Sequence, residues 1–118
     1  LTYTVVLDES SGNFKLGLAT LPDEAKAKLD ELMAKVKADP KGAYFEIEGY
    51  TDSTGSAETN KKLGLARADA VREYLYKQHQ VPLHRMNVIS YGEDNPVAKN
   101  NTRDGRAQNR RVVVKVLI

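Results

Sequence analysis

The spacing of apolar residues changes several times along the chain, and each spacing predicts an element. Alternation over Tyr3, Val5 and Leu7 predicts a first strand. Residues 43–50 and 86–91 repeat this alternation, and the apolar run 111–117 completes a set of four predicted strands. Two other stretches have the spacing of amphipathic helices; their apolar positions are Ala25, Leu29, Leu32, Met33 and Val36 in the first, and Leu63, Ala66, Ala70, Val71 and Leu75 in the second.

Polar and turn-forming residues set the expected ends of the helices. Thr20, followed by Pro22 and Asp23, predicts a side-chain cap at the start of the first helix, and residues 39–42 predict its end. The second helix is expected to end near residues 78–82. A short helical stretch around 105–109 is expected before the last strand.

These elements follow one another as strand, helix, strand, helix, strand, strand. This order predicts an α/β (α+β) fold, a two-layer sandwich with both main helices on one face of a four-stranded mixed sheet. The 118 residues suit one domain spanning 1–118. Because the chain begins with Leu1 rather than Met, we expect it to be excised from a longer protein. No membrane span is expected, since the longest apolar run is strand-length and interrupted by Lys115.

Composition removes most enzyme classes. The chain has no Cys, which excludes a thiolate nucleophile and a Cys-ligated zinc site. His79 and His84 have no recognisable nucleophile motif beside them and are expected at the surface. Phosphate-binding and metal-binding motifs are missing, and Glu46 and Glu48 are expected on a solvated strand face. We therefore predict a protein that is not an enzyme and needs no cofactor or metal.

Charge is unevenly distributed, although the net charge is only +2. Residues 99–118 hold six cations and one anion, most of them within 101–112 (NTRDGRAQNRRV), whereas the rest of the chain has a net charge of −3. These arginines could contact nucleic-acid phosphates or pair with acidic residues of this chain. No aromatic residues are interleaved with them and the chain is nearly neutral, so no nucleic-acid partner is expected.

Two further segments carry candidate chemistry. Residues 49–55 (GYTDSTG) follow the central strand, where ligands collect in α/β proteins, and Asp52 there either receives a cation or caps the turn. On the second helix, Asn60, Gly64 and Arg67 are spaced to share one face. A helical Gly costs about 1 kcal/mol against Ala, which indicates a close approach at Gly64 or a helix start. Arg67 either serves such a site or extends its head into water.

Together these segments resemble the C-terminal domain family of outer-membrane protein A, which includes the peptidoglycan-associated lipoprotein and the periplasmic domain of the flagellar stator. The family pattern runs approximately G-H-T-D-x-x-G, N-x-x-L-S-x-x-R-A, G-x-x-x-P and N-x-T-x-x-G-R-A-x-N-R-R-V. This chain has GYTDSTG, NKKLGLARA, GEDNP and NNTRDGRAQNRRV in the same order. The resemblance covers nearly all of residues 14–118.

The resemblance implies a module of the Gram-negative periplasm that binds peptidoglycan and tethers the outer membrane or an envelope complex to the cell wall. The ligand it implies is the meso-diaminopimelate residue of the stem peptide. The domain itself is not expected in the membrane, whereas the longer protein is expected to be membrane-anchored. Asp52 and Arg67 fall on the family's ligand-binding pair. The predicted ligand-binding set is completed by Asn60, Leu63, Thr54, Arg110 and Gly17.

The chemistry of this ligand agrees with the pair. The side chain of diaminopimelate ends in an ammonium and a carboxylate on one carbon, so it needs an anion and a cation a few ångströms apart. Asp52 can accept from the ammonium, and Arg67 can hold the carboxylate through two parallel hydrogen bonds. We therefore expect the two side chains to lie beside each other in a groove at the sheet edge.

The chain departs from the family pattern at several positions. Relatives usually carry an F-D-F-D-like segment before the first helix, but residues 14–18 read FKLGL, and Gly17 stands in place of the second acid. A side-chain contact made there in relatives would have to use backbone here. Tyr50 replaces the usual His, and Gly64 the usual Ser. These changes leave open a second function, a periplasmic protein–protein interaction domain that has lost peptidoglycan binding.

Overall fold

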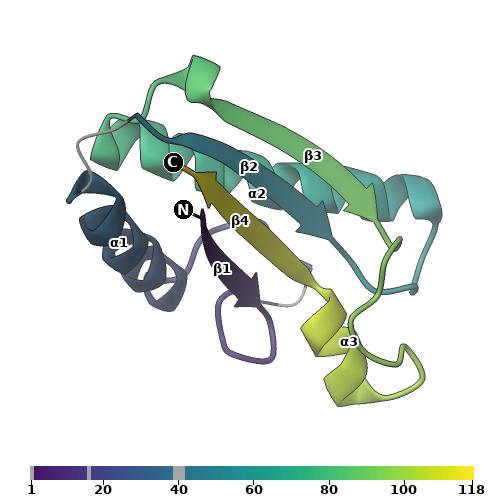
Figure 1. Ribbon diagram of the computed structural model, residues 1–118. Helices are drawn as coiled ribbons and strands as arrows, with labels where there is room; N and C mark the ends of the chain where they lie inside the picture. Colours follow the sequence, from purple (N-terminus) through teal and green to yellow (C-terminus); the bar gives the residue numbers. More distant parts are fainter. Residues whose placement is uncertain (1, 16, 39–41) are drawn as a thin grey trace.

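The computed structural model of the protein describes residues 2–15, 17–38 and 42–118. Two main helices lie on one face of a four-stranded mixed sheet, as predicted (Figure 1). The elements are β1 (Thr2–Asp8), α1 (Asp23–Lys37), β2 (Tyr44–Tyr50), α2 (Ala57–His79), the 3-10 helix η1 (Leu83–Arg85), β3 (Met86–Gly92), α3 (Arg103–Asn109) and β4 (Arg111–Leu117).

The order of the strands in the sheet brings distant parts of the chain to one edge. The order is β1-β4-β2-β3, with β4 antiparallel to β1 and β2, and β2 parallel to β3. The C-terminal ends of β1 and β2 therefore flank the start of β4 (Figure 1). In register, Arg111 lies opposite Asp8 on one side and Tyr50 on the other. The residues just beyond these three positions must meet at the same edge.

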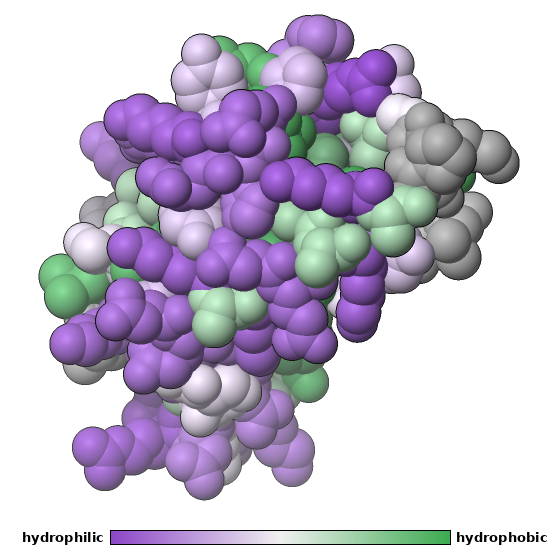
Figure 2. Space-filling view, turned by 90° about the vertical axis from the view of Figure 1, so that its left-hand side faces the viewer, coloured by the Kyte–Doolittle hydropathy of each residue, from purple (hydrophilic) through white to green (hydrophobic). Residues whose placement is uncertain are grey.

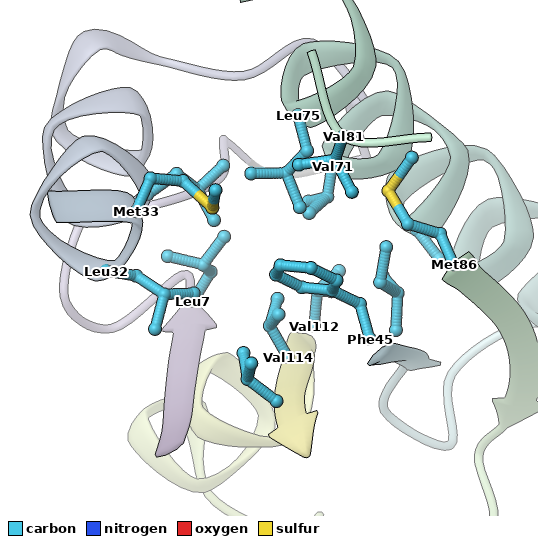
Figure 3. Packing of buried hydrophobic residues seen from close by; sticks show 14 of the residues in the cluster. Leu7, Leu32, Met33, Phe45, Val71, Leu75, Val81, Met86, Val112 and Val114 are labelled. Atoms are coloured by element: carbon cyan, nitrogen blue, oxygen red, sulfur yellow. The ribbon is translucent and has the colours of Figure 1, made fainter. Parts of the chain in front are cut away.

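The hydrophobic core lies between the sheet and the two helices (Figure 3). From the sheet, Leu7, Val112 and Val114 are fully buried, and the ring of Phe45 points into the centre of the cluster. Each fully buried aliphatic side chain contributes about 1.5–3 kcal/mol to stability. Because alternate residues of a strand face opposite sides, a slip of one residue would expose this set, so the core fixes the register.

The ends of the helices differ in part from the prediction. The predicted side-chain cap at Thr20 is wrong: α1 begins at Asp23, and Pro22 precedes it without a side-chain cap. The carbonyl of Pro22 accepts the first backbone hydrogen bonds of the helix, and Thr20 lies three residues before the first helical residue. The end predicted at residues 39–42 lies mostly outside the described residues. α2 ends at His79, within the predicted region.

Two side chains expected at the surface are buried in part or fully. The side chain of His79 is 14% exposed, and its Nε2 lies 2.7 Å from Asp30 Oδ1 on α1. Glu48, expected on a solvated face, is 4% exposed and accepts a hydrogen bond from the Tyr50 hydroxyl at 3.1 Å. His84 is exposed, as expected. The first contact joins α1 to α2, and the second lies on the sheet face that the helices leave uncovered.

The start of α2 touches β2 backbone to backbone. A Cβ atom at Gly49 would lie 2.1 Å from the carbonyl oxygen of Gly64, and one at Gly64 would lie 2.7 Å from Ser90 Oγ. The close approach expected at Gly64 is therefore confirmed. This contact seats the first half of α2 on the end of β2 and places Arg67, one turn further on, above the sheet edge.

Replacing Gly49 with Ala is expected to lower the free energy of unfolding by about 3 kcal/mol, because the methyl group meets backbone that cannot turn aside. Gly64→Ala should cost less, because Ser90 Oγ can rotate away and Ala favours the helix by about 1 kcal/mol. Urea denaturation of both variants beside the wild type measures the difference. Equal losses in the two variants would contradict the contact as described.

Candidate binding site

Four side chains of alternating charge form a series of ion pairs at this sheet edge, in the order Asp52, Arg110, Glu9, Arg67. We call this series the charge chain. Asp52 Oδ2 pairs with Arg110 Nη1, Arg110 Nε lies 2.8 Å from Glu9 Oε1, and Arg67 Nη2 donates to Glu9 Oε2 at 2.7 Å. The side chains are 4%, 13%, 6% and 0% exposed in that order. Alternation gives every buried charge an opposite neighbour, which offsets the cost of removing it from water.

The strand order explains why these residues meet. Glu9 directly follows β1, Asp52 lies two residues beyond β2, and Arg110 directly precedes β4, which runs between them. The backbone N–H of Glu9 donates to the carbonyl of Arg110 at 3.2 Å, extending the β1–β4 pairing by one residue. Arg67 reaches the same edge from α2.

The guanidinium of Arg67 is fully buried and almost fully hydrogen-bonded. Its Nε donates to the carbonyl of Leu18 at 2.8 Å, and its Nη2 donates to that of Lys15 at 3.0 Å as well as to Glu9. The group lies 4.8 Å from the centroid of the Phe14 ring. Among the described residues, Nη1 has no hydrogen-bond partner. The alternative that Arg67 extends its head into water is wrong.

Burial lowers the pKa of Arg67, and the hydrogen bond and charge of Glu9 oppose that change. At Asp52, burial by itself raises the pKa, but the Thr54 hydroxyl, the Thr54 backbone N–H and Arg110 outweigh it and bring the pKa below 3.8. Asp52 Oδ1 accepts from the Thr54 N–H at 2.8 Å. Asp52 therefore caps the turn and also pairs with a cation, Arg110 of the same chain. Both roles considered from the sequence are present.

Asn60 and Leu63 lie on the first turns of α2. Asn60 Nδ2 donates to the carbonyls of Asp52 and Thr54 at 3.1 and 2.9 Å, so it holds the loop that carries both residues. Leu63 is half-buried. The structure thus brings Thr54 and Asn60 to Asp52, while the ligand contacts expected of these residues stay predictions.

Gly17 lies in the segment that precedes α1, and it is exposed with φ +70°. The hydrogen bonds from this segment to Arg67 come from the carbonyls on either side, those of Lys15 and Leu18. This segment thus contacts Arg67 through backbone rather than through acidic side chains, while the ligand contact expected at Gly17 stays a prediction.

The sequence did not predict Glu9 or the indirect link between Asp52 and Arg67. Among the ion pairs of the described residues, none joins those two directly; Arg110 and Glu9 lie between them. The only signal in the sequence is an acid placed directly after the first strand. Its partners become visible only when the pairing of β1 with β4 is known.

Surface pockets also lie elsewhere in the described part of the chain, for example between Tyr3, Lys28 and Glu31. Within this described part, no three His, Asp or Glu side chains come together in a way that could hold a metal ion. None of the helices in these ranges is long and apolar enough to cross a membrane. The face on the α1 side of the molecule is largely hydrophilic, with scattered hydrophobic areas (Figure 2).

Comparison with known sequences places the chain in a family. Residues 13–110 match the OmpA family, and the chain belongs to it. Outer membrane protein Omp38 of Acinetobacter baumannii is 34% identical over 103 residues, which are 87% of this chain and 29% of Omp38. The peptidoglycan-associated lipoprotein of Pseudomonas putida is 39% identical over 102 residues, 86% of this chain and 60% of the lipoprotein. The chain thus spans under a third of Omp38.

Solved structures share the fold. The peptidoglycan-associated lipoprotein from Burkholderia pseudomallei superposes with a TM-score of 0.81 and 29% identity, covering 95% of this chain and 89% of that one. The cell wall anchor of the T6SS from Pseudomonas aeruginosa gives a TM-score of 0.82 at 24% identity, over 98% and 81% of the two chains, which shows a common fold. The resemblance seen in the sequence motifs is confirmed.

The ionised form of Asp52 is expected to stabilise the fold in a pH-dependent way. Because its folded pKa lies below the unfolded value of 3.8, this stabilisation is present above about pH 4 and is lost as the pH falls through the folded pKa. Asp52→Asn lacks it at every pH. The difference in unfolding free energy between wild type and variant should be constant near neutral pH and shrink below about pH 4. Urea denaturation across this range tests it, and a difference independent of pH would contradict it.

Proposed function

We propose that this chain is a non-enzymatic peptidoglycan-binding domain, residues 1–118, of a longer envelope protein that it tethers to the cell wall in the periplasm. Its membership of the OmpA family supports this, as does its similarity to lipoproteins that are named for their association with peptidoglycan. The fold shared with a cell wall anchor agrees with it. The charge chain supplies the chemistry.

The observation that carries the proposal is Nη1 of the fully buried Arg67, which has no hydrogen-bond partner among the described residues. Leaving a buried donor without an acceptor costs about 1–3 kcal/mol, so a ligand that supplies the acceptor gains by doing so. A carboxylate can accept from Nη1 and from a second N–H of Arg67, so that two parallel hydrogen bonds hold it. Asp52, at the other end of the charge chain, can accept from an ammonium group.

The ligand with both groups on one carbon is the meso-diaminopimelate residue of the stem peptide. Its ammonium would replace Arg110 at Asp52, and its carboxylate would bind Arg67. Each charge-assisted hydrogen bond contributes about 1.5–3 kcal/mol, but existing internal pairs must be exchanged for the new ones. A single site therefore binds with modest, about micromolar, affinity, and the repeating polymer supplies further strength by engaging many sites.

A protein–protein interaction domain that has lost this ligand is the second candidate. Its support is the absence of acids in residues 14–18. Against it, Arg67 still has acceptors from that segment, the carbonyls of Lys15 and Leu18, and a carboxylate from Glu9. These backbone and carboxylate oxygens supply acceptors to Arg67 although the acids are absent, which favours retained binding of peptidoglycan.

Asp52→Ala is expected to abolish co-sedimentation of the protein with purified sacculi while the domain stays folded, because the ligand's ammonium loses the carboxylate that would pair with it. Arg67→Lys should weaken sedimentation strongly, since a lysine cannot form two parallel hydrogen bonds. Glu73→Gln is the matched control, because Glu73 is exposed and, among the described residues, its ion pair is with Lys77 of its own helix. Circular dichroism confirms folding. Normal pelleting of folded D52A would place the site elsewhere.

Peptidoglycan with lysine in place of diaminopimelate in the stem peptide should bind more weakly than the diaminopimelate type. Lysine keeps the ammonium but lacks the carboxylate that Arg67 would hold, and the expected loss is about 1 kcal/mol, or roughly fivefold in affinity. Sedimentation with sacculi of the two types, over a range of protein concentrations, measures this. Identical binding curves for the two types would show that Arg67 takes no part in recognising the stem peptide.

A further inference from the structure

Glu9 presents to Arg67 the same chemical group that the proposed ligand would present. One carboxylate oxygen accepts from Arg67 Nη2 at 2.7 Å, and the other lies 2.8 Å from Arg110 Nε. The side chain is 6% exposed, so this carboxylate sits inside the site rather than at its rim. It belongs to the chain itself and is present whether or not a ligand is bound.

We propose that Glu9 is a specificity-determining residue of the site: an internal carboxylate that competes with the ligand's carboxylate for Arg67. The inference rests on the proposed binding of a diaminopimelate-type ligand and names a residue outside the set that the family pattern supplies. Its basis is the bridging position of Glu9 between the two arginines.

The exchange on binding keeps every charge paired. In the free protein the pairs are Asp52 with Arg110, Arg110 with Glu9, and Glu9 with Arg67. A ligand with an ammonium and a carboxylate takes Asp52 and Arg67, and leaves Arg110 and Glu9 paired with each other. No buried charge is abandoned. At Nη2 of Arg67 the ligand's carboxylate gains only the difference between itself and Glu9, whereas the acceptor that it supplies to Nη1 is a full gain.

Selectivity follows from the same exchange. If Glu9 were absent, a ligand without the carboxylate would leave Arg67 buried without an anion, and the site would reject it strongly. With Glu9 present, Arg67 keeps its anion when a lysine-type ligand binds, so the penalty is small. Glu9 thereby lowers the preference for diaminopimelate over lysine and widens the range of stem peptides that the site accepts.

The test compares Glu9→Gln with the wild type. Gln keeps the size of the side chain but has no charge. Isothermal titration with two soluble muropeptides, one carrying meso-diaminopimelate and one lysine, gives both affinities. The ratio of the two affinities, diaminopimelate over lysine, should rise about tenfold in the variant, because without Glu9 a bound lysine muropeptide leaves both Arg67 and Arg110 without an anion, whereas the carboxylate of diaminopimelate still pairs with Arg67. Glu73→Gln should match the wild type with both.

A merely structural Glu9 would give a different result. If Glu9 only holds the arginines in place, Glu9→Gln weakens both muropeptides together, and that outcome, or unchanged selectivity, overturns the proposal. Should Glu9→Gln fail to fold, Glu9→Asp keeps the charge but is too short to bridge both arginines, and it must then show the same rise in selectivity to a smaller degree.

A failure of the proposed function is distinguished by a simpler probe. If the wild type binds neither muropeptide, the proposed function fails, and sodium acetate then tests Glu9 alone. The Nε–H resonance of Arg67 in NMR spectra should shift at lower acetate concentration in Glu9→Gln than in the wild type. Equal responses of the two proteins would show that Glu9 does not compete for carboxylates at Arg67.

Discussion

The buried positive charge of Arg67 is the constraint on which the candidate site depends. A guanidinium does not lose its proton in a protein, so its burial requires acceptors around it. Two carbonyls and one carboxylate supply them, and the carboxylate of Glu9 is shared with a second arginine, Arg110, whose own charge is balanced by Asp52. Each member is needed by its neighbour, so the four residues form one electrostatic unit rather than separate contacts.

Contacts on the opposite face of the sheet also stabilise the strand ends that carry the charge chain. Arg110 caps α3 and Arg111 begins β4, and the side chains of these consecutive residues turn to different partners. The guanidinium of Arg111 lies 3.9 Å from the centroid of the Tyr50 ring, which stacks on Tyr91 at 5.1 Å. Burial and the adjacent Glu48 raise the pKa of Tyr50 to about 12, so its hydroxyl stays a donor at physiological pH. Arg110 therefore extends from a strand start that is fixed on both sides.

The local pattern of residues was enough to predict the helices and strands. It could not predict contacts between residues that lie far apart in the sequence. Alternation and helical spacing depend on neighbours a few positions apart, and they gave the strands, the two main helices and the close approach at Gly64. The cap expected at Thr20 failed because the helix starts at Asp23, after Pro22, whose carbonyl accepts its first bonds. Glu9 could not be predicted as part of the site, because its partners come from elements more than fifty residues away.

Motif spacing identified Asp52, Arg67 and Arg110 as candidate site residues, but it did not predict how they are connected. A direct pair of Asp52 and Arg67 is the simplest arrangement for two opposite charges. The structure inserts Arg110 and Glu9 between them because β4 runs between β1 and β2. That order is a property of the whole sheet, and no local pattern encodes it.

The direction of β1 has a mechanical consequence. This strand begins at the sheet edge opposite the site and ends beside Glu9, so a load between its start and a ligand held at the site would run along the strand (Figure 1). Hydrogen bonds of an antiparallel pair lie across the strands, and such a pull would shear the whole β1–β4 ladder at once instead of unzipping it one bond at a time. The topology that assembles the charges thus also resists a pull along β1.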